Sequence, residues 1–275
     1  MRLTILAEDK KVKGFKTEHG LCIHMADGED AYLVDVGASG RFIQNAEKLG
    51  IDITQVKAVF ISHNHYDHIG GLRAFFKMNQ TAKVYAKEEV KMRTYAREWF
   101  GVIPVDGNPN VIRKNIERFI FVKDRLSVDG IDLVSDTAGE RRYFCQDDRL
   151  LRKKDGRYVP DEFLHEMFVV IKRGGKAHVL SPCSHRGIIN ILSTVKKTYG
   201  LPIGTVIGGF HMSKNGGRGM NCSEEYLQDV AERLKGFEIA SLNTGHCTGV
   251  YAFDRLETLL DGRLNYAKTG DVFEI

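Results

Sequence analysis

Four side chains able to bind metal ions lie within six residues, in the segment His63-Asn64-His65-Tyr66-Asp67-His68. Imidazole and carboxylate groups are ligands that zinc, iron and manganese accept. Because alternate residues of an extended loop point the same way, His63 and His65 can bind one ion. Asp67 and His68 follow around the corner and can reach a second ion. A surface loop that happens to be rich in histidine is the alternative, but it does not explain why all four groups follow a strand.

A strand before this segment and a helix after it would hold the four side chains in place. Residues 56–61 alternate and branch like a buried strand, and residues 69–78 have a helical pattern. Three more predicted strands run directly into a histidine, namely 177–180 with His185, 206–209 with His211, and 239–242 with His246. Ligands bind outside the carboxyl ends of strands in open α/β sheets, so we expect the four strand ends to share one pocket.

Not every residue near these strand ends has an equally clear role. We predict that His185 and His246 are metal ligands and that His211 is either a ligand or an acid–base group. Cys183 could bind metal as a thiolate or simply pack as a small buried side chain. His19 lies in a loop and could face either way, and His165 could line the pocket. His24 and His178 lie within predicted strands and are interpreted as structural.

Strands and helices alternate through both ends of the chain, which predicts an α/β architecture with helices covering sheets. The predicted strands are residues 2–6 (an edge strand), 21–25, 31–36, 83–86, 119–122, 131–134, 167–171, 264–267 and 272–275. The predicted helices are residues 41–49, 87–99, 223–235 and 250–260, with another running from Gly187 to Tyr199. Residues 101–115 are predicted to form a loop. We expect one domain over residues 1–275, with an insertion at about 87–160.

The insertion is rich in basic residues but shows no second hydrophobic core. Residues 141–157 contain seven basic and three acidic residues. This composition is typical of a solvated segment, and it would equally suit a basic lid over an anionic substrate, because cationic clusters recognise phosphate and carboxylate groups.

The composition is that of an ordinary soluble globular protein, with 43% hydrophobic and 28% charged residues. The net charge of +4 permits an anionic small-molecule substrate and does not favour nucleic acid. No apolar run approaches the ~20 residues that span a bilayer, and residues 1–10 do not resemble a signal peptide. Five cysteines without regular spacing indicate free thiols in a reducing compartment. We therefore expect a cytoplasmic protein without a membrane partner.

Motifs spread over nearly the whole chain resemble one branch of the metallo-β-lactamase fold superfamily. The segment 63–68 resembles the His-x-His-x-Asp-His signature of that superfamily. The branch contains the dihydropterin ribofuranosylaminobenzene phosphate synthases of methanopterin biosynthesis and their bacterial relatives. The further motifs that carry this resemblance are Glu18-His19-Gly20, Asp35-Val36-Gly37, Asn45-Ala46, Cys183-Ser184-His185-Arg186-Gly187-Ile188, Gly208-Gly209-Phe210-His211 and His246-Cys247-Thr248-Gly249.

The resemblance implies an αββα four-layer sandwich with a dinuclear metal site. Zinc is the metal we expect there first, and manganese, iron and magnesium are the alternatives. It implies that His63, His65 and His185 bind one metal ion, and that Asp67, His68 and His246 bind the other. Superfamily hydrolases usually bring an Asp that bridges both ions, and this chain has Cys183 near that position. Cys183 is therefore a bridging or pocket candidate, together with His19 and Asp35. By similar placement His211 would protonate the leaving group, and Asp67 would orient the attacking water.

We therefore expect a hydrolase or a pterin-type transferase acting on a phosphate or diphosphate compound. A nuclease or phosphodiesterase is the first alternative. A diiron oxidoreductase is the second, although its relatives carry a carboxylate where His65 stands and need a flavin domain, which we do not expect after Ile275. A non-catalytic binding protein is the third, and the intact ligand set argues against it.

Overall fold

The computed structural model describes residues 1–137, 139–214 and 219–275, which form two compact units. Unit 1 comprises Met1–Lys123, Asp148–Met167 and Thr269–Glu274, and unit 2 comprises Asp124–Asp147, Phe168–Lys268 and Ile275. Each unit contains one seven-stranded sheet of its own. Whether residues 87–160 are an insertion into a single domain stays a prediction. Among the described residues, no helix is long and apolar enough to cross a membrane.

Unit 1 is built on a mixed sheet with the strand order β20-β1-β2-β3-β4-β5-β8. Its strands are β1 (Arg2–Ala7), β2 (Cys22–Asp27), β3 (Asp30–Val34), β4 (Val56–Phe60), β5 (Lys83–Lys87), β8 (Phe119–Val122) and β20 (Val272–Glu274). Its helices are α1 (Arg41–Lys48), α2 (Tyr66–Ile69), α3 (Leu72–Met78) and α4 (Pro109–Lys114). Strands β3, β4, β5 and β8 run parallel. Phe42 of α1 and Phe75 of α3 belong to one buried hydrophobic cluster with Val59 and Val84 of the sheet.

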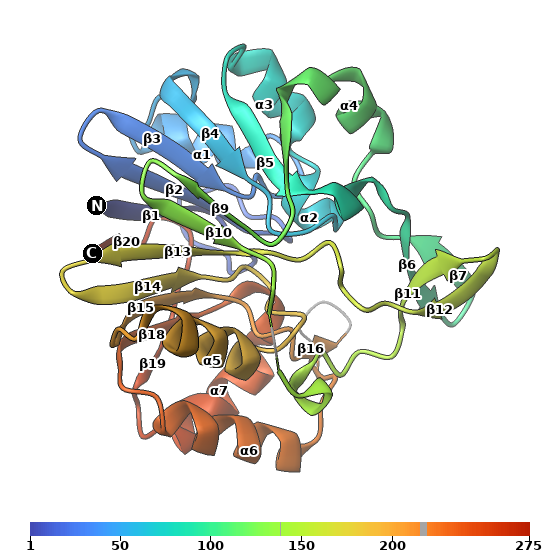
Figure 1. The fold of residues 1–275 in the computed structure, drawn as a ribbon, viewed down its shortest axis with the longest axis vertical. Helices are drawn as coiled ribbons and strands as arrows, with labels where there is room; N and C mark the ends of the chain where they lie inside the picture. The colour runs from blue at the N-terminus through green and yellow to red at the C-terminus, as the bar shows by residue number, and fades with distance from the viewer. Residues whose placement is uncertain (138, 215–218) are drawn as a thin grey trace. The chain divides into compact units, whose positions relative to one another are not determined.

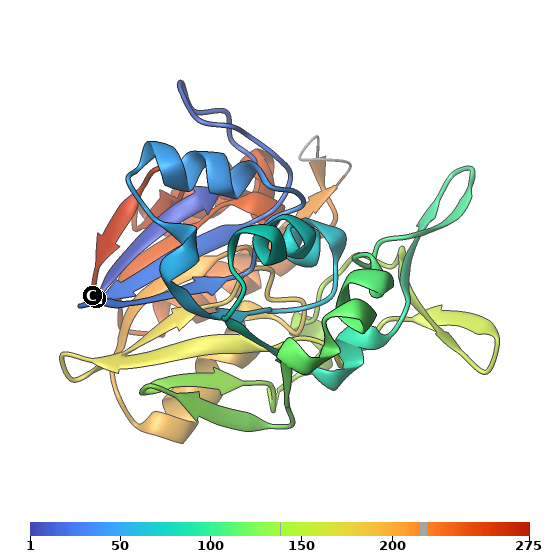
Figure 2. The same ribbon diagram turned by 90° about the horizontal axis from the view of Figure 1, so that it is seen from above.

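A second, four-stranded sheet of unit 1 has the order β12-β11-β6-β7. Its strands are β6 (Thr94–Glu98), β7 (Gly101–Pro104), β11 (Leu150–Lys154) and β12 (Arg157–Pro160). Figure 2 shows its two hairpins extending away from the rest of unit 1. The single tryptophan of the chain, Trp99, lies at the turn of one hairpin and is 94% exposed.

Unit 2 is built on a sheet with the order β19-β18-β15-β14-β13-β10-β9. Its strands are β9 (Arg125–Val128), β10 (Ile131–Val134), β13 (Phe168–Arg173), β14 (Lys176–Leu180), β15 (Ile203–Gly208), β18 (Ile239–Thr244) and β19 (Leu264–Tyr266), with a small β16 (Ser213–Lys214) and β17 (Gly219–Met220) pair. Its helices are α5 (Ile188–Tyr199), α6 (Glu224–Lys235) and α7 (Gly249–Leu259). These three helices cover one face of the sheet with an aliphatic core (Figure 1). Strands β14, β15, β18 and β19 run parallel.

Three of the predicted elements were wrong. The segment 87–99, predicted as a helix, forms a short 3₁₀ turn and strand β6, because β6 pairs with β11, a strand fifty residues later, and buries Thr94 and Ala96. The predicted loop 101–115 contains β7 and α4. Strand β1 is not an edge strand, since it lies between β20 and β2.

Candidate metal centre

The loop after β4 brings the predicted metal-binding side chains of unit 1 together. His63 and His68 are completely buried, and His65 and Asp67 are buried with only a small exposed surface. The ring centroids of His63 and His65 are 4.7 Å apart, and those of His63 and His68 are 4.1 Å apart. The short helix α2 begins at Tyr66, so it turns Asp67 and His68 back toward the histidines that precede it. The structure thus places all four predicted donors in one small volume.

Asp35 lies beneath these donors and orients two of the imidazoles. Its completely buried carboxylate lies 2.7 Å from Nδ1 of His68 and accepts hydrogen bonds from the backbone N–H and the hydroxyl of Ser62, at 2.7 and 2.6 Å. The same hydroxyl lies 2.8 Å from Nδ1 of His63. The Nδ1 atoms of His63 and His68 thus have partners below the loop, and a metal ion would bind the opposite nitrogen, Nε2, of each ring. The sequence indicated Asp35 only as a bridging or pocket candidate.

The charges around His68 fit a divalent cation. Burial opposes protonation of this imidazole, but the carboxylates of Asp67 and Asp35 outweigh it and raise the pKa of His68 to about 9. Two carboxylates within reach of one buried imidazole create a local excess of negative charge. Buried carboxylates are costly unless a positive group compensates them. A metal ion held by His63, His65, Asp67 and His68 would supply that compensation, so the residues present fit a metal ion.

His19 links Asp67 to a second carboxylate that sequence analysis missed. Nδ1 of His19 lies 2.5 Å from Oδ2 of Asp9, and Nε2 lies 3.3 Å from Oδ2 of Asp67. Asp9 also accepts a hydrogen bond from the backbone N–H of Gly20 at 3.1 Å. His19, which could have faced either way, therefore faces the proposed metal ligands. The sequence did not indicate Asp9, because Asp9 meets His19 only where the folded loop brings that histidine back, ten residues later along the chain.

His165 supports the loop 61–68 from another side. It is completely buried, with its ring centroid 6.0 Å from that of His63 and 5.5 Å from that of His65. Its Nε2 lies 3.2 Å from Oδ2 of Asp161. Burial raises the pKa of Asp161, but the His165 imidazole outweighs this effect and lowers it. The sequence suggested His165 as a pocket residue. It did not indicate Asp161, because Asp161 and His165 lie on an irregular segment without a motif.

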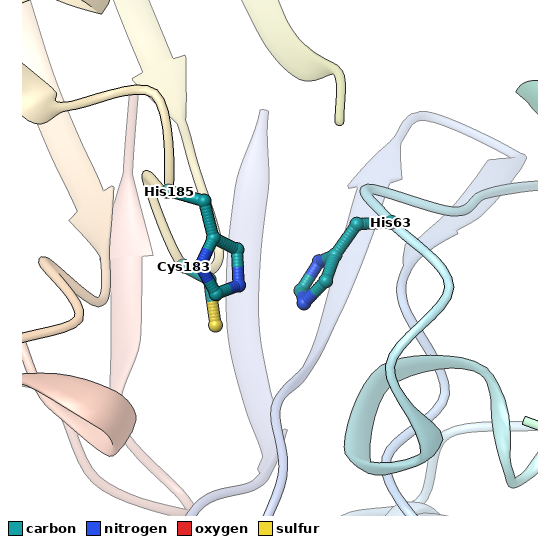
Figure 3. A group of neighbouring side chains, drawn as sticks. All are labelled: His63, Cys183 and His185. Atoms are coloured by element: carbon teal, nitrogen blue, oxygen red, sulfur yellow. The ribbon is translucent and has the colours of Figure 1, made fainter. Parts of the chain in front are cut away.

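The remaining predicted site residues follow three adjacent parallel strands of unit 2. His185 follows β14, His211 follows β15 and His246 follows β18. Parallel strands end at the same edge of a sheet, so their loops meet there. His185 and His246 are buried, and the ring centroids of His185 and His211 are 4.2 Å apart. Cys183 and His185 extend from one short loop (Figure 3), with donor atoms within 4.8 Å of each other.

The backbone around these side chains is strained. Ser184, His211 and His246 all have positive φ, at 52°, 47° and 47°, a conformation that residues other than glycine rarely adopt. Such outliers cost about 1–3 kcal/mol each and gather at functional sites. Gly208 is required for a different reason, because a Cβ there would lie 1.8 Å from the carbonyl oxygen of Ser181. The folded unit holds this edge of the sheet in a conformation that the local sequence alone would not adopt.

Known proteins of one superfamily are similar to this chain in sequence and in fold. The model of the metallo-beta-lactamase superfamily matches residues 17–139, which include the loop 61–68. The crystal structure of Tm1679, described as a metal-dependent hydrolase of the beta-lactamase superfamily, is similar with a TM-score of 0.84 and 28% identity, over 100% of this chain and 99% of that chain. The chain is therefore similar to members of the metallo-beta-lactamase superfamily and has their fold. The predicted α/β class and metallo-β-lactamase fold are therefore confirmed.

Two curated proteins of Methanocaldococcus jannaschii are also similar to this chain. One is the uncharacterized protein MJ0448, with 25% identity over 259 residues, covering 94% of both chains. The other is 7,8-dihydropterin-6-methyl-4-(beta-D-ribofuranosyl)-aminobenzene-5'-phosphate synthase, with 26% identity over 218 residues, covering 76% of this chain and 71% of the synthase. The second match confirms the predicted resemblance to the dihydropterin synthases. The superfamily consists generally of metal-dependent hydrolases that bind divalent ions.

Proposed function

We propose that this chain is a metal-dependent hydrolase acting on a small molecule that bears a phosphate or diphosphate group. The observation that carries the proposal is the 2.7 Å contact between Asp35 and Nδ1 of His68, beneath the buried donors of the loop 61–68. Imidazoles that bind metal ions are oriented in this way by a carboxylate on their second nitrogen. The similarity to the metallo-beta-lactamase superfamily supports the same reaction class.

We propose two divalent ions, most simply zinc, bound by the ligands that the sequence predicts. The proposed ligands are His63, His65 and His185 for one ion, and Asp67, His68 and His246 for the other. Bound divalent ions lower the pKa of water to about 7 and polarise phosphoryl oxygens. Asp67 orients the attacking water through its carboxylate, and His19 holds that carboxylate from the solvent side. A first position made only of imidazoles favours Lewis-acid chemistry over redox iron.

The similarity to the synthase supports a substrate with a phosphate group, because that protein is named for a 5'-phosphate product. The same similarity favours a second candidate function, transfer of a group to a pterin-type acceptor. Both reactions would use the same ligands, and they differ in the acceptor, which is water for the hydrolase. Turnover without any added acceptor therefore separates them.

Metal removal tests the proposal directly. Metal-free protein, prepared with a chelator, is assayed on a panel of phosphomonoesters, phosphodiesters, diphosphates, cyclic nucleotides and RNA, before and after zinc or manganese is added. We expect hydrolysis of one of the small phosphate compounds that depends on the metal. His65→Ala should reduce turnover by more than the roughly 10–100-fold that is typical when a residue behind a metal ligand is changed. His24→Gln should leave turnover intact.

Two results would contradict the proposal. Full turnover in metal-free protein would exclude the metal-dependent mechanism. Cleavage of RNA or cyclic nucleotides without cleavage of the smaller compounds would replace it with the nuclease or phosphodiesterase alternative.

A further inference from the structure

Two thiols and an imidazole meet at the same edge of the unit 2 sheet. Cys183, His211 and Cys247 lie on the loops after β14, β15 and β18, three strands that neighbour one another and run parallel. The ligand atoms of the three side chains all lie within 4.8 Å of one another. We propose that Cys183, His211 and Cys247 form a metal position within unit 2 whose ligands are two thiolates and one imidazole.

The distances suit one tetrahedral ion. Zinc binds thiolate sulfur at about 2.3 Å and imidazole nitrogen at about 2.0–2.1 Å, so ligand atoms that share a zinc ion lie roughly 3.5–4 Å apart. The three donors already lie within 4.8 Å, and small side-chain rotations would bring them to that spacing. Three protein ligands leave a fourth position open, which is the arrangement of catalytic rather than structural zinc sites.

Burial and the neighbours of His211 indicate a missing ligand. Cys183 and Cys247 are 2% and 5% exposed, so their sulfur atoms are shielded from bulk water. Nδ1 of His211 is buried and has no hydrogen-bond partner among the described residues. Its other nitrogen, Nε2, lies 3.9 Å from the carboxylate of Asp147. A bound ion would satisfy Nδ1, and Asp147 would then orient the ring from behind, as carboxylates do at many metal sites.

The backbone holds the three loops in register. Gly209 leaves room for the thiol of Cys247, because a Cβ at this glycine would lie 2.3 Å from that sulfur atom. The N–H of Gly209 donates to the carbonyl of Pro182 at 2.7 Å, and the N–H of Met212 donates to the carbonyl of Cys247 at 2.9 Å. These bonds connect the three loops on both sides of His211. The donors are thus positioned before any ion binds.

This metal position differs from the proposed centre in its ligands. It uses Cys247, which the proposed centre does not, and it makes His211 a ligand, one of the two roles that the sequence left open, in place of the proton donor that the family resemblance implied. Thiolate ligands select zinc and other soft ions over magnesium and manganese. A role of this ion in turnover would rest on the proposed function. Binding of the ion does not, because all three ligands belong to unit 2.

Cobalt substitution tests the site in the full-length chain. Metal-free protein is titrated with cobalt(II), and we expect the intense near-ultraviolet band of thiolate-to-cobalt charge transfer. Cys183→Ser and Cys247→Ser should each weaken this band, whereas Cys222→Ser, which removes a half-buried thiol of the same unit, should retain it. His65→Ala should also retain the band, because His65 belongs to unit 1.

The outcomes separate this inference from the proposed function. Bound cobalt without a charge-transfer band in the wild-type protein would overturn the thiolate site, whether or not the cysteine variants fold. A band that persists in the Cys183→Ser/Cys247→Ser double variant would overturn it as well. A thiolate band in a protein whose turnover ignores metal removal would leave this site standing and reject the proposed function.

Discussion

At the scale of single residues, Asp35 is the group on which the unit 1 ligands depend most. It is buried at the end of β3, where it accepts two hydrogen bonds from Ser62 and contacts His68. Asp35 also has positive φ, at 56°, so the fold accepts backbone strain to place the carboxylate there. Its contacts fix the ring orientation of His68 directly and that of His63 through the hydroxyl of Ser62.

Replacing Asp35 by Asn should therefore weaken metal binding. We expect a roughly 10–100-fold loss of zinc affinity, the usual effect of changing a residue behind a metal ligand. Competition with a chromophoric chelator measures the affinity. Asp30→Asn is the matched control, because Asp30 forms an exposed ion pair with Lys57, and such pairs contribute little. Equal zinc affinity in the Asp35→Asn variant and the wild type would show that Asp35 only supports the fold.

The sequence indicates the candidate metal ligands of unit 1 more clearly than the residues that orient them. His63, His65, Asp67 and His68 form a dense motif after a strand, and chemistry and spacing alone point to a metal. Asp9 and Asp161 carry no such pattern, since each acts on an imidazole brought to it by loop geometry. An orienting carboxylate can come from any loop that passes behind the ligand, so local spacing does not reveal it.

At the scale of elements, strands with strong local patterns were predicted correctly and those that depend on distant partners were not. Strands β4, β13, β14 and β15 alternate or branch clearly, and a turn or a loop motif follows each of them. Strand β6 is different, because its residues favour a helix when taken alone, and only pairing with β11 makes it a strand. Helix α4 did have a local signal, Asn108 before Pro109, which caps its first turn.

Strand β2 contains a buried histidine, His24, whose protonation in acid should destabilise the protein. Burial and the nearby Arg2 guanidinium lower the pKa of His24 from 6.5 to about 4. The unfolded chain therefore binds a proton more readily than the folded one between these values. The contribution of neutral His24 to the free energy of unfolding is fully present above about pH 6.5 and is lost as the pH falls through about 4. The whole contribution is roughly 3 kcal/mol.

Urea unfolding of the wild type and His24→Gln at pH 7 and pH 4.5 measures this effect. We expect the free energy of unfolding to fall more with acid in the wild type than in the variant. The change in unfolding free energy between pH 7 and pH 4.5 is compared between the two proteins. This comparison cancels any cost of the buried substitution that does not depend on pH. An identical loss in both proteins would show that His24 does not couple folding to acid.

At the scale of the whole molecule, the chain combines two compact units with separate cores, and each carries candidate metal ligands of its own. The candidates in unit 1 are three imidazoles and a carboxylate. The candidates in unit 2 are imidazoles and thiols. If a unit binds an ion only when it is folded, metal binding is coupled to the folding of that unit.

This coupling can be measured by amide hydrogen exchange of the metal-free and zinc-loaded protein. Zinc at about 100 times its dissociation constant should add about 2.7 kcal/mol to the opening free energy of any segment whose unfolding releases the ion. We expect protection to rise both in β4 of unit 1 and in β15 of unit 2. Magnesium should have a smaller effect than zinc at β15, because thiolates disfavour it. Protection confined to β4 would mean that unit 2 contributes no ligand, and protection confined to β15 would mean that zinc occupies the thiolate position alone.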